Sequence, residues 1–327
     1  MSSFESVAQS LSRTGPLHRL DRWVNTLPHP GLVCEIAPTH VAATRWNNTK
    51  GSLGAYTIEA LPDGAVAPSP LEPNLVKPEV VRSAIARVFR QVVPRSPALA
   101  LLIPDPVVRV FILQFESFPR RADEAAPLLR LRLKKSVPFD VDETVVSWMR
   151  QPGRETKIEI VAAVARSSIV REYEEAVEAI GLAPGVVLSS SLASLPLIET
   201  HGATLFARMS GRNMTTAIVR AGSLCVYRSA EMAADAGLLE PQAALDEVFP
   251  AIAYFQDTWK ESLDRVRVAG FGPRKEVFRR ALANELKCSA DPISEADGPR
   301  NLPGEARELM NEDLEPLVGW MMNGSQA

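Results

Sequence analysis

The stretch that decides the fold begins with Leu99-Ala-Leu-Leu-Ile-Pro104 and Val107-Val-Arg-Val-Phe-Ile-Leu-Gln-Phe115, two apolar runs joined by Asp105-Pro106. The runs are rich in β-branched and aromatic residues, which fit the pleated surface of a sheet. The polar connection contains proline, a residue typical of turns. We therefore predict that the two runs pair as a β-hairpin.

A helix, a strand and a second helix are predicted to follow. The first helix begins at Asp123-Glu124, alternates leucines with basic residues, and ends at Pro138, because proline cannot continue a helix. Residues 157–165 form a predicted buried strand, and residues 168–180 form a predicted helix that Gly181 ends. The stretch therefore describes a compact α/β module without a catalytic constellation.

Four short motifs follow one another in this stretch: Ile103-Pro104, Val137-Pro138-Phe139-Asp140, Ile160-Val-Ala-Ala-Val-Ala-Arg166 and Ala179-Ile-Gly-Leu-Ala-Pro184. In their order they resemble PilM, the actin-like cytoplasmic family of type IV pilus assembly, and the resemblance runs from about Leu32 to the C-terminal helix. It implies a two-lobed α/β fold of the actin-like, ribonuclease H-like class. As in the cell-division protein FtsA, a small inserted α+β subdomain is expected.

The resemblance also implies a division of the chain into five segments. They are an N-terminal extension (1–30), a first-lobe segment (31–98), the inserted subdomain (99–187), the second lobe with its phosphate-type hairpin and glycine turn (188–291), and a C-terminal helix that returns to the first lobe (292–327). Within the first lobe, a Pro-rich connection leads into a predicted amphipathic helix over residues 79–92.

The extension contains a predicted helix over residues 17–27, which Pro28-His29-Pro30 ends. Its apolar positions lie on one side at helical spacing: Leu17, Leu20, Val24 and Leu27. Such a stripe could dock on this chain or on another protein. We expect it to dock on the body of its own chain.

Composition limits the class of protein. At 327 residues the chain is long enough for two lobes, and its net charge of −3 argues against nucleic acid as the main partner. Three widely spaced cysteines favour a reducing cytosol over a metal cluster or disulfide framework. No apolar run reaches the roughly 20 residues that cross a bilayer, and the N-terminus lacks a secretory signal. We expect a cytoplasmic protein that is peripheral to the inner membrane through a partner.

One cluster departs from the acidic balance of the chain. It consists of Arg130, Arg132, Lys134 and Lys135 in the first predicted helix of the module. We interpret it as a solvated helix face, with contact to anionic lipid headgroups as the alternative.

The resemblance implies that a nucleotide lies between the lobes, held by two β-hairpins and a glycine-rich turn. In the first hairpin, residues 32–44, Glu35 takes the place of the family's Asp and Ala37 that of its Gly. A phosphate cradle uses close backbone N–H groups, often at positive φ, which glycine allows and Ala37 or Pro38 resists. Glu35 and Thr39 are the candidate nucleotide contacts of this hairpin.

The second hairpin, residues 204–228, has Ala221-Gly222 as its predicted reversing turn. Arg208 stands where the family has Asp and Ser210 where it has Gly, and with Gly211 they are candidate contacts. A carboxylate at 208 would help to hold Mg²⁺, whereas a guanidinium has no acceptor and repels the metal. Hydrolysis by the family's route is therefore not expected. Arg208 either pairs with a phosphate or forms a structural ion pair, and the second is favoured.

The third element, Val266-Arg-Val-Ala-Gly-Phe-Gly-Pro-Arg274, resembles the family's strand that ends in Gly-Gly-Gly-Ala. Gly270 and Gly272 are kept, while Phe271 either stacks on adenine or fills an empty pocket, and filling is favoured. Each of the three elements has lost a residue that contact with phosphate or purine favours. The sequence therefore predicts a degenerate nucleotide site, with no cofactor other than ATP or ADP held without hydrolysis.

Other catalytic constellations are weak. The four histidines lack metal-ligand spacing, and Ser189-Ser-Ser191 lacks the nucleophile elbow of serine hydrolases and is expected to begin a helix. The carboxylates between 172 and 178 are expected on an exposed helix face. We predict no catalytic residue and no metal site.

The predicted function is a non-catalytic scaffold of the pilus assembly platform. The resemblance implies capture of the cytoplasmic N-terminal peptide of a PilN-like membrane protein, and through it association with a PilO-like partner. Val137, Pro138 and Phe139 are the candidate docking surface, because an apolar groove or strand edge accepts an extended peptide. Two alternatives stay open: an active actin-like ATPase with altered motifs, and the cytoplasmic component of a type II secretion system. Self-association, as in PilM-like rings or filaments, is also left open.

Overall fold

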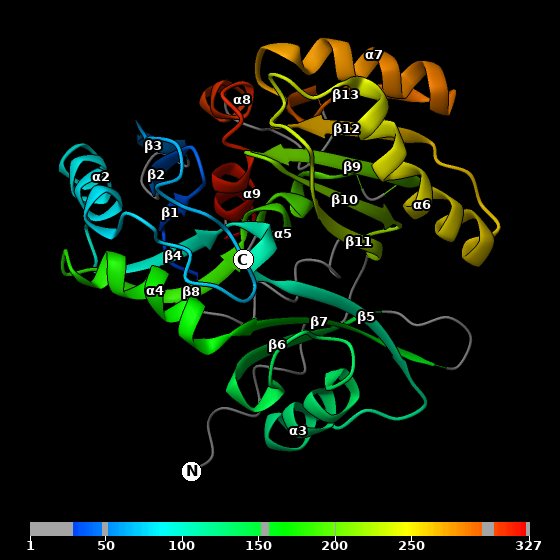
Figure 1. The fold of residues 1–327 in the computed structure, drawn as a ribbon, viewed down its shortest axis with the longest axis horizontal. Helices are drawn as coiled ribbons and strands as arrows, with labels where there is room; N and C mark the ends of the chain where they lie inside the picture. The colour runs from blue at the N-terminus through cyan, green and yellow to red at the C-terminus, as the bar shows by residue number, and fades with distance from the viewer. Residues whose placement is uncertain (1–28, 48–51, 152–156, 200, 296–303, 325–327) are drawn as a thin grey trace.

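The computed structural model describes residues 29–47, 52–151, 157–199, 201–295 and 304–324. They form two five-stranded sheets and one three-stranded sheet, with helices on their faces (Figure 1). The helix predicted over residues 17–27 lies outside the described residues. Within the described ranges, every helix is too short or too polar to cross a bilayer.

The first lobe is built on a sheet with the strand order β3-β2-β1-β4-β8. Its strands are β1 (Leu32–Ile36), β2 (His40–Asn47), β3 (Ser52–Ala60), β4 (Ala98–Ile103) and β8 (Ala183–Ser189). Strands β1 to β3 are antiparallel, whereas β4 runs parallel to both β1 and β8. Helix α2 (Pro78–Gln91) buries Val81, Ile85 and Val88 in the first-lobe core, as the helical spacing predicts, and α4 (Ser167–Glu178) packs beside it.

The second lobe repeats this topology in the order β11-β10-β9-β12-β13. Its strands are β9 (Ala203–Ser210), β10 (Asn213–Arg220), β11 (Ser223–Glu231), β12 (Arg265–Ala269) and β13 (Ser289–Pro292), and its helices are α6 (Pro241–Trp259) and α7 (Lys275–Leu286). Ala221 and Gly222 both have positive φ, 48° and 73°, as a tight hairpin turn between β10 and β11 requires. The predicted reversing turn is therefore confirmed.

The inserted subdomain is a three-stranded antiparallel sheet covered by one helix. It contains β5 (Arg109–Phe115), α3 (Ala122–Leu133), β6 (Thr144–Gln151) and β7 (Ile158–Arg166), in the strand order β5-β7-β6. Leu129 and Leu133 of α3 pack on Ile160 and Val164 of β7 to form its core. In Figure 1 the subdomain lies below the two lobes, with α3 at its outer end.

The predicted hairpin of the two apolar runs is wrong. Strand β4 belongs to the first lobe, while β5 belongs to the inserted subdomain. Residues Leu99–Ile103 are buried on both faces, as in the middle of a partly parallel sheet, whereas β5 is only half-buried. The prolines around Asp105 carry the chain from one sheet to the other. The inserted subdomain therefore spans residues 109–166, and β4, α4 and β8 of the expected 99–187 segment lie in the first lobe.

The C-terminal helices lie beside the first lobe and next to the second, as Figure 1 shows for α8 (Gly304–Asn311) and α9 (Glu315–Gly324). Helix α9 contacts β1 and the short helix α5 (Ser190–Ser194). Its Trp320 is buried, stacks on His29 with ring centroids 4.3 Å apart, and donates from Nε1 to the Pro30 oxygen at 3.1 Å. The first described residues of the chain are thereby fixed to α9.

Gly319 allows α9 to approach α5 closely, because a Cβ atom there would overlap the backbone oxygen of Ala193. We expect Gly319→Ala to lower the free energy of unfolding by about 1–3 kcal/mol, the usual cost of overpacking. Urea denaturation measures the change. Gly304→Ala, at the start of α8 with open space around the new methyl group, is the matched control and should be near neutral. Equal effects of the two substitutions would contradict this packing.

Candidate functional site

Arg208 lies in the middle of the molecule, on the central strand β9 of the second lobe. Its side chain is 3% exposed and contacts three carboxylates: Glu35 of β1 at 3.2 Å, Asp105 at 3.6 Å, and Glu315 at the start of α9. We call these four residues the interlobe cluster. One guanidinium thus joins the second lobe to two segments of the first lobe and to the C-terminal helix.

Asp105 is held by several further donors. Ser191 donates from its backbone nitrogen at 2.9 Å and from Oγ at 2.6 Å, Thr215 donates at 2.9 Å, and the hydroxyl of Tyr227 donates at 3.3 Å. Ser191 comes from the first lobe and the other two donors come from β10 and β11 of the second. Asp105 is therefore a second junction between the lobes.

The charged groups of the interlobe cluster shift one another's pKa values. Burial opposes charge on Arg208, but the surrounding carboxylates, Glu315 first, hold its pKa above the ordinary value. Burial acts against the charged form of Glu35 too, yet a hydrogen bond from His40 and the charge of Arg208 keep the pKa of Glu35 below its usual value. Burial raises the pKa of Glu315 to about 7, opposed by Arg208 and supported by Asp313 and Glu35. The pKa values of Glu35 and Glu315 are thus shifted in opposite directions, and Glu315 is the easier of the two to protonate.

The two turns expected to cradle phosphate touch each other. Gly211, between β9 and β10, has φ +58°, and a Cβ atom added to it would lie 3.2 Å from Cβ of Pro38 in the turn between β1 and β2. Thr39, predicted as a nucleotide contact, shares a hydrogen bond of 3.1 Å with its neighbour His40 and is exposed. Ser210 is half-buried at the end of β9. The structure therefore brings the two turns together, with Pro38 lying against Gly211.

The glycine turn after β12 binds a carboxylate of the same chain. Gly270 and Gly272 each donate a backbone N–H to Asp313 at 3.1 Å, and Lys275 lies 2.7 Å from the same carboxylate. Gly270 has φ +73°, and a side chain there would overlap the backbone of Met209. Asp313 lies between α8 and α9, and Glu315, two residues later, begins α9, so one C-terminal segment reaches both the glycine turn and the interlobe cluster.

Phe271 is directed into the core of the second lobe. It is 1% exposed, and its ring centroid lies 4.5 Å from that of Phe278 on α7. No face of the ring is open to a purine. Phe271 therefore fills apolar space in the second lobe and cannot stack on adenine in this conformation.

A groove of about 260 Å³ separates the first lobe from the inserted subdomain. It is lined mainly by apolar side chains: Ile103, Val108, Val145, Val187, Leu188 and Leu192, with Ser147, Ser189 and Glu174 among the polar ones. Strands β8 and β6, which each stand last in the order of their sheets, supply part of the lining, and the central strand β7 and helix α4 supply most of the rest. Two sheet edges therefore border the groove.

The predicted docking residues Val137, Pro138 and Phe139 lie elsewhere. They follow α3 in the loop before β6, Pro138 is exposed, and Phe139 packs against the core between α3 and the three-stranded sheet. None of the three is among the described residues that line the groove. Sequence reasoning missed the groove because its walls come from four segments that only the fold brings together.

The groove and the interlobe cluster are connected. Ser189, which lines the groove, lies 3.4 Å from the hydroxyl of Tyr227, and that hydroxyl donates to Asp105. A second connection joins the inserted subdomain to the second lobe, where the side-chain amide of Gln151 donates to the Leu224 oxygen at 2.7 Å and accepts from its nitrogen at 3.1 Å. Each part of the molecule is thus tied to the other two.

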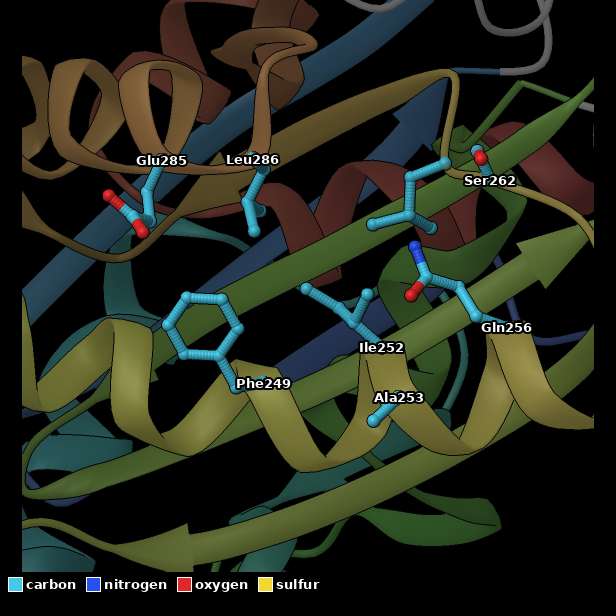
Figure 2. A pocket seen from close by; sticks show the side chains of 8 residues that line it. Phe249, Ile252, Ala253, Gln256, Ser262, Glu285 and Leu286 are labelled. Atoms are coloured by element: carbon cyan, nitrogen blue, oxygen red, sulfur yellow. The ribbon is translucent and has the colours of Figure 1, made fainter.

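A second hollow, of about 380 Å³, lies between α6 and α7 on the second lobe. Figure 2 shows Phe249 and Ile252 of α6 pointing across it toward Leu286 of α7. The described residues contain no group of His, Cys, Asp or Glu side chains placed to hold a metal ion, here or elsewhere. This hollow therefore presents apolar side chains beside three polar ones, Gln256, Ser262 and Glu285, without a candidate metal site among the described residues.

Removing the cation of the cluster should destabilise the fold strongly. Arg208→Met leaves three buried carboxylates without their common partner, so we expect a loss of about 3–5 kcal/mol in the free energy of unfolding. The control is Arg280→Met, which breaks an exposed pair with Glu276 and should cost less than about 1 kcal/mol. Chemical denaturation at pH 8 checks both. Similar small losses in the two variants would show that the cluster does not hold the lobes.

The raised pKa of Glu315 predicts a pH dependence of stability. Between its ordinary value of 4.5 and about 7, the folded state binds more protons at this site than the unfolded state. Stability from this group is therefore present at low pH and is lost as the pH rises toward 7, by up to about 1.4 kcal/mol per pH unit. Glu315→Gln should flatten the profile in that window, whereas Glu308→Gln, exposed on α8, should leave it unchanged. Unfolding curves from pH 4.5 to 8 measure the slope.

Comparison with known proteins finds solved structures of similar fold but no match in sequence. The sequence matches no protein-family model, and no curated protein matches it. Among solved structures, a chain of the PilM-PilN type IV pilus biogenesis complex is similar over 92% of this chain and 100% of its own length, with a TM-score of 0.70 and 16% identity. The cytoplasmic domain of EpsL, an inner membrane component of the type II secretion system of Vibrio cholerae, follows with a TM-score of 0.49, 12% identity, and coverage of 90% and 94%.

A protein of Bacteroides thetaiotaomicron with an actin-like ATPase fold and unknown function has a TM-score of 0.48 and 12% identity, over 82% of this chain and 92% of its own. Both lobes of the present chain have the same five-stranded topology, and the C-terminal helix returns to the first. The predicted two-lobed, actin-like α/β fold with an inserted subdomain is therefore confirmed, and it is the fold of the matched chain in the PilM-PilN complex.

Proposed function

We propose that this chain is a non-catalytic scaffold of type IV pilus assembly, whose groove between the first lobe and the inserted subdomain binds the cytoplasmic N-terminal peptide of a PilN-like membrane protein. The observation that carries the proposal is the interlobe cluster. Arg208 and its carboxylates fill the region between the lobes where a nucleotide-binding relative would hold phosphate and Mg²⁺.

The chemistry of the cluster opposes ATP hydrolysis. Mg²⁺ prefers carboxylate and water oxygens, and a guanidinium in their midst neutralises the carboxylates and repels the ion. The two phosphate-type turns contact each other through Pro38 and Gly211, and Asp313 occupies the amides of the glycine turn. A nucleotide would have to displace all three sets of contacts. These features support a degenerate site and a structural role for Arg208.

The groove suits an extended peptide. A segment lying between β8 and β6 can pair its backbone with an unpaired sheet edge and place alternate side chains on apolar residues such as Val145 and Val187. The similarity to a PilM-PilN complex supports a PilN-like partner over an unrelated peptide. Because such a partner is anchored in the inner membrane, it would hold this chain at the cytoplasmic face of that membrane.

Isothermal titration with a synthetic peptide tests the proposal. The peptide comprises the residues that precede the membrane span of a PilN protein from the same genome. Val145→Asp places a charge in the apolar groove at a side chain that is already 47% exposed, so the fold should tolerate it. We expect peptide affinity to fall at least about tenfold, or 1.4 kcal/mol. Val93→Asp, exposed away from the groove, should bind as the wild type does.

Two results would overturn the proposal. If Val145→Asp leaves peptide binding intact, the groove is not the peptide-binding site. A dissociation constant for Mg²⁺-ATP below about 1 mM, the upper end of ordinary substrate affinities, together with ATP turnover, would show that the chain is an active ATPase and not a scaffold.

A further inference from the structure

We propose that residues 17–27 of this chain occupy the same groove when no partner is bound, so that the N-terminal extension is an internal competitor for the partner peptide. This inference deepens the proposed function by assigning a regulator to the groove. It rests on where the chain enters the described structure, on the two open sheet edges, and on the charge and pattern of the extension.

The chain enters beside the strand that forms one wall of the groove. Pro30 lies against β8, because its Cγ atom is 3.4 Å from where a Cβ atom on Gly185 would stand. Trp320 holds the backbone oxygen of Pro30 through a hydrogen bond. Val187 and Ser189, further along the same strand, line the groove. At about 3.3 Å per residue they are only about 7–13 Å away. The 28 residues before His29 are more than enough chain to cover that distance.

The groove presents a surface that proteins usually cover. Strands β6 and β8 end their sheets and leave one row of backbone groups each without a strand partner among the described residues. Val145 is 47% exposed beside them, and Ser147 is exposed too. An uncovered, apolar strand edge promotes association with other chains, which natural proteins avoid by placing a segment over it.

Residues 17–27 match this surface in pattern and in charge. Their apolar positions Leu17, Leu20, Val24 and Leu27 recur on one side. Arg19, Asp21 and Arg22 lie between them and leave the segment with a net charge of +1. Glu174 is the charged residue among the described ones that line the groove, and it also lies 3.6 Å from Arg171. Apolar contacts with one opposite-charge pair fit an occupant of this kind better than an acidic or purely polar segment.

Tethering makes weak contacts sufficient. A segment joined by a short connection acts at an effective concentration in the millimolar range, so it occupies the groove even when its intrinsic affinity is low. A partner peptide must then displace it, and the apparent affinity of the partner falls by the fraction of chains in which the groove is free. The extension would thus set a threshold for partner capture and protect the open edges from unwanted pairing.

Hydrogen exchange on the full-length chain tests the occupant directly. We compare the wild type with the double variant Leu20→Asp/Val24→Asp, which places two charges in the stripe, and measure amide exchange over residues 144–149 and 186–192 by mass spectrometry. Loss of the occupant should speed exchange at the groove edges at least about threefold. The matched control Asn25→Asp/Thr26→Asp adds the same two charges beside the stripe and should exchange like the wild type.

Swapping charges between the groove and the extension tests whether Arg19 and Arg22 lie near Glu174. Glu174→Lys should speed groove exchange in the same way, and combining it with Arg19→Glu and Arg22→Glu should restore slow exchange. Identical exchange in the wild type and Leu20→Asp/Val24→Asp would overturn the proposal, as would an equal effect of the control. Protection that strengthens with protein concentration would assign the groove to a second copy instead. No PilN peptide is present in these measurements, so their failure would leave the result of the peptide titration unaffected.

Discussion

The burial of one guanidinium determines how this molecule is put together. Arg208 is removed from water in the middle of the chain's fold, and a buried charge is tolerated only when opposite charges and hydrogen bonds surround it. Those partners come from β1, from the turn after β4 and from the first residue of α9. The ion pairs add little net stability compared with apolar packing, but their geometry admits one arrangement of the two lobes and the C-terminal helix.

The position of the cluster supports the proposal that this fold serves without nucleotide chemistry. In a two-lobed ATPase, a nucleotide and its metal supply the interactions that hold the lobes together. Here the chain supplies them itself: Arg208 is the cation, and Asp313 presents a carboxylate to the backbone amides of the glycine turn. Opening the lobes would expose or separate these groups without any ligand to replace them. The resulting interface favours a fixed arrangement over a cycle of opening and closing.

The sequence could reveal which positions depart from the family pattern but not which residues contact Arg208 in the fold. Arg208 and the glycine turn are recognisable because they lie within local strand and turn patterns. Asp105 looked like part of a turn between prolines, and Glu315 belongs to a helix 107 residues away in sequence, so no local pattern connects either of them to Arg208. The groove was missed for the same reason. The error at the first apolar run had a visible signal, because five consecutive apolar residues in 99–103 indicate a strand buried on both faces rather than one arm of a two-stranded hairpin.

The fixed lobes also bear on the affinity of the groove for the proposed peptide. One wall ends at Ser189, which contacts Tyr227, and Tyr227 donates to Asp105 of the interlobe cluster, while Gln151 ties the opposite wall to the second lobe. Walls held in this way lose little conformational freedom when a peptide enters, so more of the contact energy appears as affinity. A nucleotide-driven relative would have to keep its lobes closed to achieve the same. An internal ion cluster between the lobes therefore gives the groove preorganised walls, which is the property that the proposed scaffold role requires.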